Sequence, residues 1–144
     1  MLIAALESVA AGQSGNGYAA VGIGSNSGSY TDTALGVEFV IGHTIGIGGE
    51  LGAVLRHSDF GFVSLDGSVH LSHSGAKGKV DPFVIGGYTR AITIFSGANG
   101  ANFGGGVNYW LTRHFGVRAE FRDMRFTSGG TYNFWALRGG IAFR

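Results

Sequence analysis

Two side chains in the middle of the chain have the types and spacing of a nucleophile and its base. His70 and Ser72 stand two positions apart in the stretch His70-Leu71-Ser72-His73, so in a β-strand they point to the same face. A histidine beside a serine can take the hydroxyl proton and activate the oxygen for attack. Asp66 lies further along that face, but no matching glutamate follows downstream. We therefore predict no catalytic residue and interpret His70 as polar lining or a histidine near a turn.

The other motifs that could support chemistry are incomplete. The chain has no cysteine, which excludes thiolate metal sites, and its five histidines form no H-E-x-x-H pattern. The run Gly104-Gly105-Gly106 lacks the Lys-Ser/Thr that completes a phosphate-binding loop. We interpret these glycines as small residues that admit neighbouring side chains or allow the strand to curve. The net charge is +1 and no basic cluster occurs. We predict no metal site, no cofactor and no nucleic-acid partner.

The composition narrows the fold class. Glycine contributes 28 of the 144 residues, far above the typical ~7%, and each glycine inside a helix costs ~1 kcal/mol relative to alanine. A helical bundle is therefore unfavourable. The chain is 44% hydrophobic and 12% aromatic, which argues against intrinsic disorder. Its glycines follow no G-X-Y period, which excludes collagen.

Alternating large apolar residues and small or polar residues predict β-strands. We expect strands near residues 18–24, 33–42, 45–56, 60–72, 80–91, 101–111, 115–125 and 132–143. Short links near residues 42–45 and 111–115 join some of them, and segments rich in Gly, Ser, Asn or Thr join others. This pattern predicts an all-β, antiparallel, up-and-down barrel of eight strands, closed by pairing residues 132–143 with 18–24.

The two faces of these strands are unequal. One face carries large apolar residues on nearly every strand, and the other carries glycine, small polar residues and charges. The interior of an eight-stranded barrel is just wide enough to be filled by side chains. The face with glycine, small polar residues and charges therefore fits inside, and the face with large apolar residues fits against lipid. Val37, Phe39, Leu51, Leu65, Val69, Val107, Phe121, Leu137 and Ile141 are expected outside. The barrel is therefore predicted to be transmembrane.

Acidic and basic residues occur in similar numbers on this inner, glycine-rich face. Pairing between them would make their burial tolerable. We predict a charge network in the lumen from Glu38, Glu50, Asp66, His70, Arg118, Glu120, Arg122 and Arg138. Arg56 and Arg90 are further candidates.

The remaining assignments of faces rest on weaker alternation. On the first and fifth strands we assign Val21 and Ile23, then Phe83 and Ile85, to the apolar outer face. Aromatic residues near strand ends are typical of interfacial girdles. For these girdles we expect Tyr109, Trp110 and Phe115 at one end and Phe60, Phe95 and Phe126 at the other. The alternative is that these aromatic residues fill a core.

The N-terminal segment is assigned separately. The first eleven residues, MLIAALESVAA, are apolar and small, as at the end of a signal peptide, but they lack a basic region. A leader remnant and a short helical segment both fit. We divide the chain into an N-terminal segment, residues 1–17, and a barrel domain, residues 18–144.

The C-terminal sequence resembles the terminal-strand signature of bacterial outer-membrane barrels. Trp135, Leu137, Ile141 and Phe143 alternate, and an aromatic residue stands next to the last position. Residues 102–123, NFGGGVNYWLTRHFGVRAEFRD, also resemble small eight-stranded barrels of the OmpA transmembrane-domain type. This resemblance implies location in the bacterial outer membrane, contact with its lipid, and insertion by the barrel-assembly machinery.

Three functions follow in order of preference. The first is a non-enzymatic, monomeric outer-membrane barrel with a plugged lumen and a structural or surface-interaction role, whose loop partner the sequence does not identify. The second is a soluble, lipocalin-like barrel that holds a small ligand. The third is a lipid-modifying outer-membrane enzyme, because His70-x-Ser72 resembles the catalytic pair of lipid A deacylases.

Overall fold

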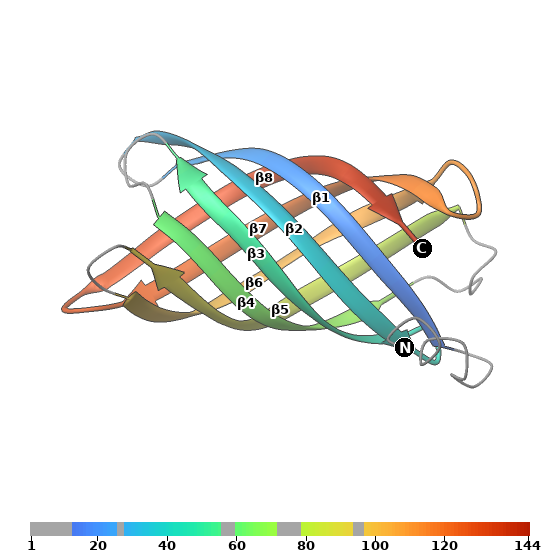
Figure 1. The fold of residues 1–144 in the computed structure, drawn as a ribbon, viewed down its shortest axis with the longest axis horizontal. Coiled ribbons are helices and arrows are strands. Elements are labelled where there is room, and N and C mark those ends of the chain that lie inside the picture. Colours follow the sequence, from blue (N-terminus) through green and yellow to red (C-terminus); the bar gives the residue numbers. More distant parts are fainter. Residues whose placement is uncertain (1–12, 26–27, 56–59, 72–78, 94–96) are drawn as a thin grey trace, which may run out of the picture.

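The computed structural model describes residues 13–25, 28–55, 60–71, 79–93 and 97–144. These residues form eight strands: β1 (Gln13–Ser25), β2 (Ser29–Ile41), β3 (Ile45–Leu55), β4 (Phe60–His70), β5 (Val80–Ile92), β6 (Gly97–Trp110), β7 (Phe115–Thr127) and β8 (Thr131–Phe143) (Figure 1). They contain no helix long and apolar enough to cross a membrane. The sequence that resembles a leader remnant, residues 1–11, lies outside the described part.

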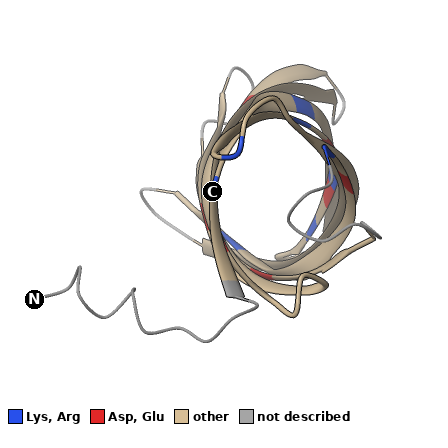
Figure 2. Ribbon diagram, turned by 90° about the vertical axis from the view of Figure 1, so that its right-hand side faces the viewer, with Lys and Arg blue, Asp and Glu red and all other residues tan. Residues whose placement is uncertain are grey.

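The strands close into one antiparallel barrel in which each strand pairs with its neighbours in sequence. The ring closes between β1 and β8, in a register that runs from Gly17 opposite Phe143 to Ser25 opposite Trp135. Viewed close to the barrel axis, the strands surround a single lumen (Figure 2). Closure leaves no open sheet edge. The predicted all-β, up-and-down, eight-stranded barrel is confirmed.

Three strands begin earlier than the alternation predicts. β1 begins at Gln13, β2 at Ser29 and β6 at Gly97, so residues 13–17 belong to the first strand and not to the N-terminal segment. The added residues carry few large side chains, and the alternation of apolar residues therefore did not mark them. Backbone pairing holds them instead, because residues 13–17 lie in register with residues 37–41 of β2.

The outer surface carries the large apolar side chains, as predicted. Leu65 is 65% exposed and Leu51 61%, and even the least exposed of the expected band, Val107, is half-buried. The exposed members are Val37, Phe39, Leu51, Leu65, Val69, Phe121, Leu137 and Ile141. Val21 and Ile23 of β1 also point outward, as predicted.

The predicted orientation of β5 is wrong. Phe83 and Ile85 are buried inside the barrel, whereas Val84 and Tyr88 point outward. Apolar residues occupy both faces of this strand, so alternation alone did not fix its orientation. The ring of Phe83 fits inside because its partner on β6 is Gly106, where a Cβ atom would come within 2.8 Å of the ring.

The predicted aromatic girdles are only partly correct. Tyr109 and Phe115 are exposed on the outer surface, but Trp110, Phe60 and Phe126 are buried inside the barrel. The prediction used only the position of these residues near strand ends. Successive side chains of a strand point to opposite faces, and each of the three buried aromatic residues lies on the same face as the inward polar residues of its strand. Phe95 lies outside the described residues.

Candidate functional site: an ionic cluster in the lumen

The structure places the predicted charge network inside the barrel. Each of its members is at most 8% exposed: Glu38, Glu50, Asp66, His70, Arg118, Glu120, Arg122 and Arg138. They project from β2, β3, β4, β7 and β8, so the cluster joins most of the wall. Arg90, a further candidate, is exposed instead, and Arg56 lies outside the described residues.

Glu120 on β7 is the centre of the network. Arg118 Nη2 lies 2.6 Å from Glu120 Oε2, and Arg122 Nε lies 2.6 Å from Glu120 Oε1. Arg138 Nη1 on β8 reaches the same Oε1 atom at 3.4 Å. Three guanidinium groups therefore neutralise one buried carboxylate, which would otherwise carry a large desolvation cost.

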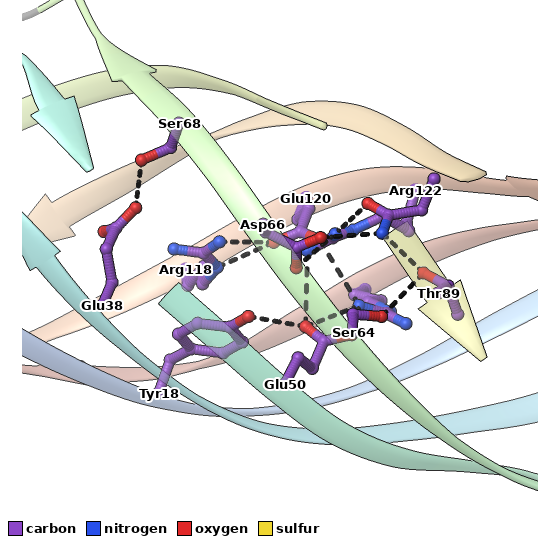
Figure 3. A network of polar contacts seen from close by, with 12 residues as sticks. Tyr18, Glu38, Glu50, Ser64, Asp66, Ser68, Thr89, Arg118, Glu120 and Arg122 are labelled. Atoms are coloured by element: carbon purple, nitrogen blue, oxygen red, sulfur yellow. Dashed lines mark hydrogen bonds and ion pairs between the residues drawn. The ribbon is translucent and has the colours of Figure 1, made fainter. Parts of the chain in front are cut away.

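Glu50 on β3 connects the opposite wall to the same guanidinium groups. Arg138 Nη1 donates to both its carboxylate oxygens, at 2.9 and 3.1 Å, and Arg122 Nη2 donates to Oε2 at 3.3 Å. The hydroxyl of Tyr18 on β1 donates to Oε2 at 2.6 Å. Figure 3 shows the side chains of Tyr18, Glu50 and Arg122 converging from different strands. The contacts tie β1, β3, β7 and β8 together across the lumen.

Polar side chains complete the cluster on the side of β4, β5 and β6. Arg122 Nη1 donates to Asp66 Oδ2 at 3.2 Å and to Asn102 Oδ1 at 2.7 Å. Asn102 Nδ2 in turn donates to Asp66 Oδ1 at 2.7 Å and to the hydroxyl of Thr89 at 2.5 Å. The hydroxyls of Thr89 and Ser64 are 2.7 Å apart. The buried carboxylate of Asp66 thus has several partners, as buried polar groups require.

A smaller cluster surrounds His70 at the end of β4. Its Nε2 atom lies 3.1 Å from Glu38 Oε2, and its Nδ1 atom lies 2.9 Å from Asp81 Oδ2. Ser68 donates a hydrogen bond to Glu38. Both ring nitrogens of His70 therefore face carboxylates inside the barrel, which suits a doubly protonated ring that donates on both sides. Ser72 and His73, from the stretch with catalytic residue types, lie outside the described residues.

Asp32 and Asp81 belong to the lumen but were not predicted there. Asp32 is fully buried, and Arg138 Nη2 lies 2.9 Å from its Oδ2 atom. Asp32 is six positions before Glu38 and therefore lies on the same face of β2. It was not considered because the predicted strand began only at residue 33. Asp81 was missed because the orientation of β5 was assigned to the opposite face. Within the described part of the chain, no group of histidine and acidic residues is arranged to hold a metal ion.

Glycines on neighbouring strands make room for the largest inward side chains. Tyr18 lies in register with Gly36, where a Cβ atom would come within 2.2 Å of the tyrosine ring. The guanidinium of Arg118 sits over two inward rings, 4.1 Å from the centroid of Tyr18 and 4.0 Å from that of Phe83. The glycine-rich inner face is therefore complementary in shape to the cluster.

Apolar groups pack inside the barrel on either side of the ions. An aromatic group at the end where β7 and β8 are joined contains Tyr30, Phe60, Phe126 and Phe134, packed edge to face. Trp110 is buried together with Tyr18 and Ala142. Together, the ionic cluster and these apolar groups occupy the lumen with side chains.

The residues of the C-terminal signature lie on the outer surface of β8. Trp135, Leu137, Ile141 and Phe143 are 43–58% exposed. Phe143 covers Gly17 of β1, where a Cβ atom would come within 2.2 Å of its ring. The aromatic residue next to the chain end therefore packs across the seam where the barrel closes.

Comparisons with known proteins identify the fold. No protein-family model matches the sequence, and no curated protein matches it. The N-terminal β-barrel domain of Pseudomonas aeruginosa OprF is similar in structure, with a TM-score of 0.70, 18% identity, and coverage of 92% of this chain and 98% of that one. Neisserial surface protein A gives a TM-score of 0.68, 15% identity, and coverage of 92% and 99%.

The outer membrane enzyme PagL is a further structural neighbour, with a TM-score of 0.63, 12% identity, and coverage of 85% and 97%. At these identities the likeness concerns the fold. The chain thus has the eight-stranded fold seen in these proteins, with an ionic cluster of its own residues in the lumen.

Proposed function

We propose that this chain is a bacterial outer-membrane protein whose barrel spans the bilayer. The observation that carries the proposal is the inverted distribution of residues, with large apolar side chains outside and buried ion pairs inside. Leu35, Leu65 and Ile23 are each at least 65% exposed, and such residues surround the barrel. A soluble protein rarely exposes an apolar patch larger than a few hundred Å². A lipocalin-like barrel would instead place the apolar residues around an internal ligand cavity.

Refolding with and without lipid tests this placement. The chain should fold in detergent micelles or lipid vesicles and run as a compact band on gels when unheated, and as an unfolded band after boiling. Without detergent it should aggregate. A monodisperse, folded protein in plain buffer would support the soluble barrel and overturn the proposal.

The second part of the proposal is a non-enzymatic role, structural or in surface interaction, for a monomeric barrel with a closed lumen. The network crosses the lumen from Arg122 on β7 to Glu50 on β3 and Asp66 on β4 and places buried side chains where a pore would run. His70 is 5% exposed with both ring nitrogens facing carboxylates, a poor position for a base that acts on lipid at the outer surface. Planar-bilayer recordings should show no steady conductance, whereas a steady, open channel would contradict a plugged lumen.

The third part concerns assembly. The exposed signature on β8, and above all Phe143 over Gly17, supports recognition by the barrel-assembly machinery during insertion. Phe143→Ala should reduce the folded protein in cell envelopes more strongly than Phe39→Ala, a matched control on the outer face of β2. Both variants should still refold in detergent. Equal envelope levels for the two variants would contradict a specific role for the C-terminal aromatic residue.

A further inference from the structure

A pocket opens at the end of the barrel where β7 and β8 are joined. It has a volume of about 290 Å³, and Phe60, Ala91, Ala98, Phe126, Tyr132 and Phe134 line it. Thr93 and Ser128 complete the lining. Its volume is just below the usual range for ligand pockets, which begins at about 300 Å³, so only a small ligand would fit.

The aromatic wall of the pocket is held rigid by its own ring contacts. The ring of Phe60 lies 5.8 Å from that of Phe126 and 5.3 Å from that of Phe134, with interplanar angles of 85° and 72°. Phe126 and Phe134 contact each other at 5.9 Å and 71°. Each of the three rings is thus fixed by two edge-to-face partners. A wall ordered before binding loses little conformational entropy when a ligand arrives.

Apolar packing closes the pocket toward the ionic cluster. Val54, Met124 and Ala136 are at most 1% exposed and belong to the same apolar group as Phe60 and Phe126. A ligand in the pocket would therefore contact aromatic rings and not the buried ions. The pocket is open on its other side, where Tyr132 is 52% exposed.

We propose that this pocket binds a small neutral aromatic molecule with one or two rings and a single hydrogen-bonding group. None of the described lining residues is charged, which favours a neutral ligand. The three phenylalanine rings offer edge-to-face and offset-stacked contacts to a further ring. The side chains of Ser128 and Tyr132 provide hydroxyl partners for one polar group. This proposal does not depend on whether the barrel spans a membrane. The location of the barrel decides only which compartment the pocket faces.

Alanine methyl groups give a direct readout of binding. The protein would be labelled with ¹³C at alanine methyls, placed in lipid nanodiscs and titrated with indole. Ala91 and Ala98 line the pocket, whereas Ala101 and Ala119 are exposed on the outer face and report indole that merely dissolves in lipid. We expect saturable ring-current shifts at the first pair. Shifts of equal size at all four methyls, shifts without saturation, or no shift at all would overturn the proposal.

Two leucine substitutions on β6 provide the matched test. Ala98→Leu fills the pocket and should weaken indole binding about tenfold or more, measured at the Ala91 methyl. Ala101→Leu adds the same side chain to the outer face and should leave binding unchanged. Tyr132→Ala removes an exposed wall, spares the buried packing and should weaken binding about threefold or more. Unchanged affinity in both pocket variants would overturn the proposal, and the Tyr132 variant decides the matter if Ala98→Leu does not fold.

Discussion

Breaking the Glu50–Arg138 pair should destabilise the barrel strongly, and the two residues should be coupled. Glu50→Gln removes a charge that faces Arg138 at 2.9 Å and Arg122 at 3.3 Å, where both guanidinium groups are about 1% exposed. Removing one partner of such a buried pair costs about 3–5 kcal/mol. Arg138→Met should cost at least as much, because it also deprives Asp32 of its 2.9 Å partner.

A double-mutant cycle isolates the coupling. In the double variant neither partner is left as an uncompensated charge opposite the other, so its cost should fall below the sum of the single costs by about 1–3 kcal/mol. The free energy of unfolding would be measured by urea titration in phospholipid vesicles with tryptophan fluorescence. The pair Asp123–Arg125 provides the control, because its N–O distance is 3.2 Å but Arg125 has a side chain that is 55% exposed.

The control pair should show a coupling of about 0–1 kcal/mol, because solvent around the exposed guanidinium of Arg125 weakens the attraction. Additivity within about 0.5 kcal/mol for Glu50 and Arg138 would refute the reasoning. A coupling equal to that of the control pair would also refute it, since burial of both partners is what should distinguish Glu50–Arg138 from a pair whose arginine is exposed.

Further predictions concern the outer surface, the glycines and the N-terminus. Leu137→Arg should lower the free energy of unfolding in vesicles by about 2–4 kcal/mol if the site lies near the bilayer midplane, and an unchanged urea midpoint would argue against lipid contact. Gly36→Val should cost about 1–3 kcal/mol by the same assay, because its Cβ would meet the Tyr18 ring, whereas Gly139→Ala has no atom within 4 Å of the added Cβ and should be tolerated. Removing residues 1–12 should leave the heat-sensitive compact band on gels intact, while deleting residues 18–24 should abolish it, since the ring then cannot close.

The sequence predicted the strand number, the closure and most inward and outward faces because period-two alternation reports the two faces directly. It failed on β5, where Val84 and Ile85 are both apolar, and the side chains of neighbouring strands, not hydrophobicity, decide the orientation. Asp32 was missed because β2 begins several residues before the first clearly alternating residue. Backbone pairing, and not apolar side chains, extends the strand there.

The partners within the lumen could not be predicted from the sequence. Arg138 and Glu50 are 88 positions apart, and Arg138 and Asp32 are 106 apart. Which of them meet depends on the stagger of the strands around the whole ring. A change of register by two residues keeps every side chain on its face but exchanges its neighbours across the lumen.

The two tryptophans provide the most direct test of which face meets lipid. Trp135 is 46% exposed on the outer surface, and Trp110 is 3% exposed inside the barrel. The variants Trp110→Phe and Trp135→Phe each leave one tryptophan, whose fluorescence would be measured in vesicles containing brominated phospholipid. A barrel with its apolar face against lipid predicts strong quenching of Trp135 and weak quenching of Trp110. Equal quenching of both, or stronger quenching of Trp110, would contradict the proposed arrangement.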